Sequence, residues 1–349
     1  MFKRVLVPLD GSERAERAIP LAARIAGASG GAVVLARVVA TPVEYGPVFA
    51  PSFGSDVVEA EQREFAGYLA EVAGLPALSG IETETKVLAG SPAFAILQAI
   101  VQKKIDLVVM TSHGRSGLTR WVLGSVAQHI AQSSPAPVLV LREHGPDLIE
   151  TQGGSANARI AVTLDGSPLA EEAIMPAAAL LAALTPRGAL TLTMVVTPFE
   201  ARTKDMPQAL IMDGANNYLS GVASEVRAAW PGLTVSWSIA VGVDPADTIA
   251  RIVEGRDISD QATGERYDAI AMATHGRTGL AHWAFGSVTE RVLHGTTLPL
   301  LIVRTNKSAP EMKPDAVRVG ATTDSPDDHT HEKTAHDRIV DRVPAWPLF

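Results

Sequence analysis

The sequence predicts an α/β protein made of two doubly wound, parallel-sheet domains in tandem, each flavodoxin-like with five strands. The first observation behind this is a duplication. The motif at residues 111–118 returns 162 residues later, and the motif at residues 7–12 returns 155 residues later. Solenoid repeats recur every ~20–50 residues, so copies this far apart are whole domains. The second observation is that short, continuously apolar runs alternate with longer amphipathic stretches, which is typical of parallel strands with helical crossovers.

Five strands are expected in each copy, where apolar residues follow one another without alternation. In the first copy they are residues 4–9, 32–40, 82–89, 107–112 and 137–142. In the second copy they are residues 158–164, 189–197, 234–241, 269–274 and 298–304.

Four helices are expected between the strands of each copy, and start signals precede several of them. Ser12 and Ser167 are N-cap residues in front of stretches rich in alanine and glutamate. Ser91 and Asp244 each offer an N-cap oxygen directly before a proline, which is favoured in the first helical turn. The last helix of each copy is expected to begin at a Gly-Ser pair.

Glycine-rich and proline-containing breaks, together with the repeat, predict the domain boundaries. Domain 1 is expected to span residues 1–143, a linker 144–157, and domain 2 residues 158–305. Domain 2 has about nine extra residues near positions 255–261, which predict a polar loop at the third helix. Residues 306–349 have almost no apolar periodicity and are expected to be disordered.

Composition excludes several classes of protein. The chain has 349 residues, of which 46% are hydrophobic, enough for two packed cores. A net charge of -8 without a basic face argues against a nucleic-acid partner. The lack of cysteine excludes disulfides, thiolate catalysis and Cys-ligated zinc. No apolar segment near the start is long enough for a signal peptide or a membrane span, so we expect a cytoplasmic protein without a membrane partner.

The duplicated loop has the composition of an anion-binding turn. Gly114 and Gly117 carry no side chains, so main-chain N–H groups can approach an anion closely. Nine residues separate Gly114 from Gly124, which with Ser125 begins a helix whose free N–H groups and dipole favour a phosphate. The loop follows a parallel strand and so lies at the carboxyl edge of the sheet, where open α/β sheets bind ligands.

Asp10 and Asp165 end the first strand of each copy and are expected to face the same crevice. Taken alone, such an aspartate could cap a helix, and a single glycine could serve tight packing. The whole constellation instead favours a nucleotide cleft, with base and ribose near the first strand and phosphates on the loop and helix.

This combination resembles the universal stress protein family, and specifically its tandem two-domain members, over nearly all of residues 3–304. The family's loop reads Gly-x2-Gly-x9-Gly-Ser/Thr. The resemblance implies a stress-response regulatory protein that binds ATP or AMP in each domain, with Mg²⁺ as an optional companion of ATP. It also implies that the last strands of the two domains pair antiparallel, which makes an internal pseudo-dimer. A homodimer and the identity of a protein partner stay open.

The expected nucleotide-binding residues lie at the ends of the first, second and fourth strands, in the loop, and at the start of the fourth helix. In domain 1 they are Pro8, Leu9, Asp10, Val38, Met110, Thr111, His113, Gly114, Arg115, Gly117, Gly124, Ser125 and Val126. In domain 2 they are Thr163, Leu164, Asp165, Val195, Met272, Ala273, His275, Gly276, Arg277, Gly279, Gly286, Ser287 and Val288.

Departures from the family pattern rank the two sites. The family's first loop glycine is Thr111 in one copy and Ala273 in the other, and a Cβ there narrows the approach to the phosphates. Thr111 keeps a hydroxyl donor that Ala273 lacks, and Pro8 beside the first aspartate becomes Thr163 in the second copy. We therefore expect tighter binding in domain 1.

The sequence offers no catalytic apparatus. It has no Gly-x4-Gly-Lys-Ser/Thr loop, no nucleophile elbow and no zinc-binding His-Glu-x-x-His helix. His113 and His275 keep no metal-ligand spacing with other candidates, so neither a metal site nor a catalytic residue is expected. Slow ATP hydrolysis is the most that the cleft would support. The alternative function is an interaction module that acts through protein partners and has vestigial clefts, and Thr111 and Ala273 favour it.

Overall fold

The computed structural model of the chain describes residues 2–40, 55–112, 123–142, 145–146, 148, 158–198, 207–256, 266–274 and 285–304. Most of the expected linker, most of the extra polar loop and the whole expected tail lie outside these ranges. The domain boundaries and the disorder of the tail therefore stay predictions.

The described strands lie within two residues of their expected bounds. The first half contains β1 (Arg4–Pro8), β2 (Ala32–Val39), β3 (Glu82–Ala89), β4 (Leu107–Thr111) and β5 (Val138–Leu141). The second half contains β6 (Arg159–Leu164), β7 (Ala189–Val196), β8 (Thr234–Val241), β9 (Ala269–Ala273) and β10 (Leu300–Val303).

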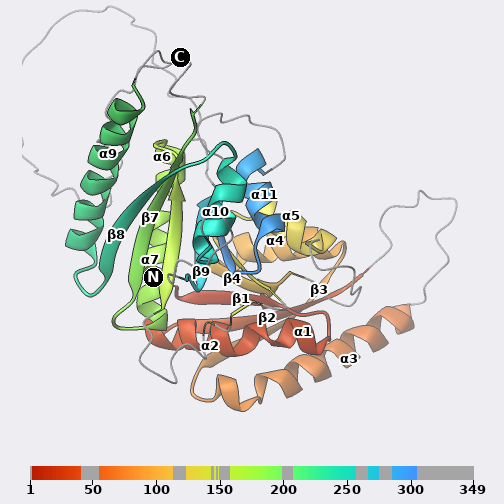
Figure 1. Cartoon of the computed structure of the whole chain (residues 1–349). Helices are drawn as coiled ribbons and strands as arrows, with labels where there is room; N and C mark the ends of the chain where they lie inside the picture. Colours follow the sequence, from red (N-terminus) through yellow and green to blue (C-terminus); the bar gives the residue numbers. More distant parts are fainter. Residues whose placement is uncertain are drawn as a thin grey trace, which may run out of the picture.

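These strands form one ten-stranded sheet in the order β3-β2-β1-β4-β5-β10-β9-β6-β7-β8 (Figure 1). Within each half all neighbouring strands are parallel. The chain order reverses between β1 and β4 in one half and between β6 and β9 in the other. Ligands bind at such reversals in doubly wound sheets. The predicted fold class, two five-stranded flavodoxin-like halves in tandem, is confirmed.

The two halves are joined through their last strands. β5 and β10 pair antiparallel, with Leu139 opposite Leu301 and Val140 opposite Leu300. This confirms the pairing that the family resemblance implied. Each strand would otherwise present an apolar edge, and an exposed apolar edge invites pairing with other chains.

Helices cover both faces of the sheet. One face carries α1 (Glu13–Glu16), α2 (Ala18–Ser29), α3 (Ser55–Ala73), α6 (Pro168–Glu171), α7 (Ile174–Leu184) and α9 (Gln208–Ala229). The other carries α4 (Pro92–Gln102), α5 (Ser125–Ser133), α10 (Pro245–Val253) and α11 (Ser287–Gly295). A 3-10 turn at Pro76–Leu78 precedes β3. Strand side chains alternate between the two faces, so each face has its own hydrophobic core.

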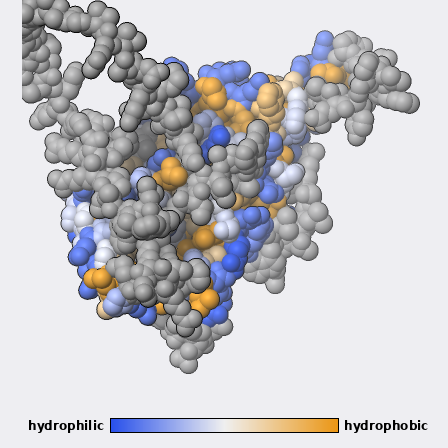
Figure 2. Space-filling model, turned by 90° about the horizontal axis from the view of Figure 1, so that it is seen from above, coloured by the Kyte–Doolittle hydropathy of each residue, from blue (hydrophilic) through white to orange (hydrophobic). Residues whose placement is uncertain are grey.

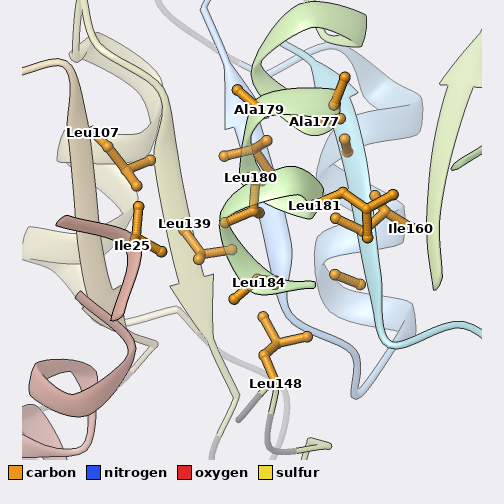
Figure 3. Packing of buried hydrophobic residues seen from close by; sticks show 14 of the residues in the cluster. Ile25, Leu107, Leu139, Leu148, Ile160, Ala177, Ala179, Leu180, Leu181 and Leu184 are labelled. Carbon is orange, nitrogen blue, oxygen red and sulfur yellow. The ribbon is translucent and has the colours of Figure 1, made fainter. Parts of the chain in front are cut away.

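The core on the α2 side runs through both halves without a break. It includes Ile25 of α2, Leu139 of β5 and Leu180 of α7, each at most 1% exposed (Figure 3). Helix α2 packs against α7, and Arg24 Nη2 donates a hydrogen bond of 2.6 Å to the Leu184 carbonyl. The apolar packing therefore makes one folded unit of the two halves.

The single helix expected after each Asp-Gly-Ser motif is in fact two helices. Ser12 and Ser167 do act as N-caps and accept from the third following backbone N–H at 3.2 Å. Pro20 and Pro176 then lie in the first turn of α2 and α7. A proline has no N–H to donate to the carbonyl four residues earlier, so the helix restarts there.

The two caps expected before prolines differ from each other. Asp244 accepts a hydrogen bond of 3.1 Å from the Ala246 backbone N–H, as predicted. Ser91 makes no side-chain cap bond, so that part of the prediction was wrong, although α4 does begin at Pro92. The fixed φ of proline suits a first helical turn even without a capping side chain.

On the face shown in Figure 2, hydrophilic and hydrophobic residues of the described segments lie intermixed. Single exposed apolar residues are ordinary on protein surfaces. No helix in the described part of the chain is long and apolar enough to span a membrane.

Candidate functional site

A cavity of about 400 Å³ lies at the carboxyl ends of β1, β2 and β4, beside the first turns of α4 and α5 and one side of α3. This is the reversal point of the first half. Every described residue that was expected to bind nucleotide in domain 1 lines it: Pro8, Leu9, Asp10, Val38, Met110, Thr111, Gly124, Ser125 and Val126. The structure thus brings together residues more than a hundred positions apart, and their role in binding stays a prediction.

The cavity also has lining residues that the sequence analysis did not single out: Ala15, Arg37, Ala40, Glu61, Phe65, Pro92, Ile96, Ser112 and Ala127. Three of them, Arg37, Glu61 and Phe65, form the wall towards α3. Their one sequence signal is Arg37, a charge inside a strand that is otherwise apolar.

The turn after β1 is held by Asp10. Its Oδ1 accepts hydrogen bonds from the Ser12 backbone N–H at 3.0 Å and from the Ser12 hydroxyl at 2.6 Å. Gly11 between them has φ +83°, a left-handed conformation that suits glycine. Asp10 therefore shapes this turn and also faces the cavity, while Ser12 rather than Asp10 caps the helix.

Helix α5 points its first turn at the cavity. Its N-cap is Gly124, so no side chain among the described residues caps the backbone N–H groups of the first turn. The Gly124 N–H itself donates to the Ser112 carbonyl at 2.8 Å, which fixes the start of the helix against the end of β4. Uncapped N–H groups and the helix dipole attract anions at such a position.

Arg37 lies between the rings of the α3 wall and the turn after β1. Its guanidinium carbon is 3.6 Å from the centroid of the Phe65 ring and 4.7 Å from that of Tyr68. The Tyr68 hydroxyl donates to Glu16 Oε1 at 2.7 Å. Burial, aided by the Glu16 carboxylate, raises the pKa of Tyr68 far above its ordinary value. The phenol is therefore a permanent donor, and the wall is fixed by an aromatic and ionic network.

The second half repeats the backbone of this site. The expected residues Thr163, Leu164, Asp165, Val195, Met272, Ala273, Gly286, Ser287 and Val288 lie at the ends of β6, β7 and β9 and at the start of α11. Asp165 Oδ1 accepts from the Ser167 backbone N–H and hydroxyl at 3.0 and 2.6 Å. The Gly286 N–H donates to the Thr274 carbonyl at 2.7 Å.

The α9 wall of the second half has a different chemistry. The Tyr218 hydroxyl donates to Glu171, as Tyr68 does to Glu16, so the two helices correspond with an offset of 150 residues. Ile211 and Ala215 on α9 then stand where the first half has Glu61 and Phe65, and strand register puts Met194 at the place of Arg37. All three replacements are buried in the hydrophobic core.

The glycine loops themselves lie outside the described residues. Eight expected site residues belong to them: His113, Gly114, Arg115, Gly117, His275, Gly276, Arg277 and Gly279. Within the described ranges, no group of three or more His, Cys, Asp or Glu side chains could hold a metal ion.

Comparisons with known proteins agree on one family. The family model of the universal stress protein family matches residues 1–142 and 157–304. The chain is 32% identical over 148 residues to the universal stress protein YxiE of Bacillus subtilis, covering 41% of this chain and 100% of that protein. It is 25% identical over 309 residues to a universal stress protein of Mycolicibacterium smegmatis, covering 86% and 96%.

A solved structure supports the fold over most of the chain. A universal stress protein from Archaeoglobus fulgidus matches with a TM-score of 0.61 and 19% identity, covering 87% of this chain and 99% of that chain. At this identity the likeness shows a shared fold.

Proposed function

Because the chain belongs to the universal stress protein family, we propose that its first cleft binds an adenine nucleotide, ATP or AMP, as a regulatory ligand in the cytoplasm. The observation that carries the proposal is the cavity of about 400 Å³ in which Asp10, Thr111 and Ser125 meet. Its volume falls in the range of small-molecule sites, ~300–1,000 Å³.

The residues that line the cavity support one orientation of the nucleotide in it. The uncapped first turn of α5 suits the phosphates, and the hydroxyls of Thr111 and Ser125 add donors there. Asp10 and Val38, at the ends of β1 and β2, suit the base and ribose. If Mg²⁺ accompanies ATP, the phosphates are its main ligands, because the described lining offers carboxylates only at Asp10 and Glu61.

The proposed role is binding rather than catalysis. The described lining contains one guanidinium, that of Arg37, and no lysine beside the phosphate end. Phosphoryl transfer depends on cations that stabilise the transferring group. Slow hydrolysis of bound ATP is the upper limit that we propose.

The second cleft is proposed as the weaker site. The aliphatic side chains of Met194, Ile211 and Ala215 stand where the first half lines its cavity with polar and aromatic side chains. This observation favours the alternative function for the second half, in which it serves as the pseudo-dimer partner of the first and as a surface for a protein partner.

Isothermal titration calorimetry of the full chain with ATP and with AMP tests the proposal. We expect saturable binding of at least one of them. Native mass spectrometry of freshly purified protein should also detect a co-purified nucleotide. A folded chain that binds neither ligand at millimolar concentration would overturn the proposed function.

A further inference from the structure

Arg37 is a buried charge in the wall of the first cleft. The residue is 6% exposed and lines the cavity. Its guanidinium lies over the rings of Phe65 and Tyr68. Among the residues that the structure describes, none accepts a hydrogen bond from its five N–H donors. A guanidinium stays charged in a protein, and burying it without acceptors is costly. Acceptor atoms of a ligand in the cavity would satisfy these donors.

The guanidinium lies directly against the turn that carries Asp10. A Cβ placed on Gly11 would lie 2.9 Å from Arg37 Nη2 and 3.0 Å from its Nη1. The guanidinium thus fills the space that a side chain at position 11 would need. The strand order β2-β1-β4 sets the end of β2 ~10 Å from the end of β4, at ~4.8 Å per strand. Arg37 is therefore at the opposite end of the cleft from the phosphate position.

The second half shows that the fold itself does not need this arginine. Met194 occupies the corresponding position and is 5% exposed in the core. The second half nonetheless keeps the same turn, with Asp165 and Ser167 bonded as Asp10 and Ser12 are. The arginine is a feature of the first cleft alone.

We propose that Arg37 is a specificity-determining residue whose guanidinium donates hydrogen bonds to acceptor atoms of the ligand's nucleobase, beside Asp10. The inference rests on the proposed function and adds that the protein recognises the nucleobase of the ligand. An ionised aspartate only accepts and an arginine only donates. Adenine carries a donor, its N6 amine, next to an acceptor, N7. Side by side, Asp10 and Arg37 match such an edge.

Calorimetry with two probes separates recognition of the base from a structural role. The probes are ATP and ribose 5-triphosphate, which lacks the base, and the variant is Arg37→Met, which installs the residue of the second half. We expect ATP binding to weaken by about tenfold or more, the loss of a hydrogen bond from a charged donor. Binding of ribose 5-triphosphate should stay the same. Arg63→Met on the exposed side of α3 is the matched control and should change neither affinity.

A structural role would weaken both probes equally, since a displaced Asp10 turn distorts the whole cleft. That result, or unchanged ATP affinity in Arg37→Met, would overturn the inference while leaving the proposed function intact. Absence of ATP binding in the unmodified chain would instead overturn the proposed function itself. If Arg37→Met fails to fold, Arg37→Lys is the second variant, because lysine retains the charge but lacks the planar set of donors of a guanidinium. The same loss of ATP affinity, without a loss for ribose 5-triphosphate, is then expected.

Discussion

At the scale of the residue, Gly124 offers a direct test of the proposed phosphate position. Its φ of -58° and ψ of 148° are open to any residue, so Gly124→Val adds bulk at the cavity without backbone strain. The valine side chain would stand where a phosphate meets the first turn of α5. We expect the variant to fold normally and to lose the tighter of two ATP sites, as measured by calorimetry.

Gly67→Ala is the control for this variant. Gly67 lies on α3, and a Cβ added there meets nothing within 4 Å, so ATP binding should not change. A folded Gly124→Val chain with the full affinity of the unmodified protein would show that the phosphates bind elsewhere.

At the scale of the element, Glu84 on β3 joins three segments through its carboxylate. Arg4 of β1 lies 2.6 Å from one of its oxygens, and Lys103 after α4 and Lys86 lie 2.8 and 3.0 Å from the other. These three cations hold the pKa of Glu84 at about 2, below the ordinary 4.5. The charged form is therefore favoured in the folded chain.

Glu84→Gln should lower the free energy of unfolding at pH 7 by about 1 kcal/mol or less, because the partners are partly exposed. A folded-state pKa that is depressed contributes stability above pH 4.5, and this contribution is lost as the pH falls through 2. The difference in free energy of unfolding between the variant and the unmodified protein, measured by urea unfolding, should therefore shrink as the pH falls from 4.5 to 2.

Glu82→Gln provides the comparison within β3, since Glu82 is exposed on the same strand. Its free energy of unfolding should match that of the unmodified protein at pH 7. A Glu84→Gln effect that persists undiminished at pH 2 would contradict the ion-pair explanation.

At the scale of the whole molecule, the two clefts are expected to differ although their backbones match. The second half has Ala273 in place of Thr111 and the aliphatic wall of Met194, Ile211 and Ala215. A Gly286→Val chain should retain the tighter site and a Gly124→Val chain the weaker one. One lost hydrogen bond predicts affinities that differ by roughly three- to tenfold. Equal affinities, or a tighter second site, would contradict this ranking.

The continuous core predicts that the halves unfold together. Leu139 is fully buried opposite Leu301, in the core that also contains α7. Leu139→Ala should lower the free energy of unfolding by about 2–5 kcal/mol and keep a single transition in chemical denaturation. Val101→Ala on α4, where Val101 is 65% exposed, should cost far less. Two separate transitions would show that the halves are independent.

The strands, the fold class and half of the first cleft follow from the sequence alone. Continuous apolar runs are local signals, and each strand lies within two residues of its expected bounds. The Asp-Gly-Ser turn is also local, because Asp10 bonds to Ser12 two residues away. Since parallel strands share one carboxyl edge, the strand ends marked by Asp10 and Thr111 had to meet.

Only the tertiary structure decided which side chains complete the cleft and which helices pack against each other across the two halves. Arg37 on a strand and Phe65 on a helix are 28 residues apart, and no sequence motif predicts that they stack. Met194 and Ala215 occupy the corresponding positions in the second half, where they are part of the hydrophobic core. Helix α2 meets α7 more than a hundred residues away. Such contacts depend on how helices sit on the sheet, and side-chain packing over the whole molecule sets that position.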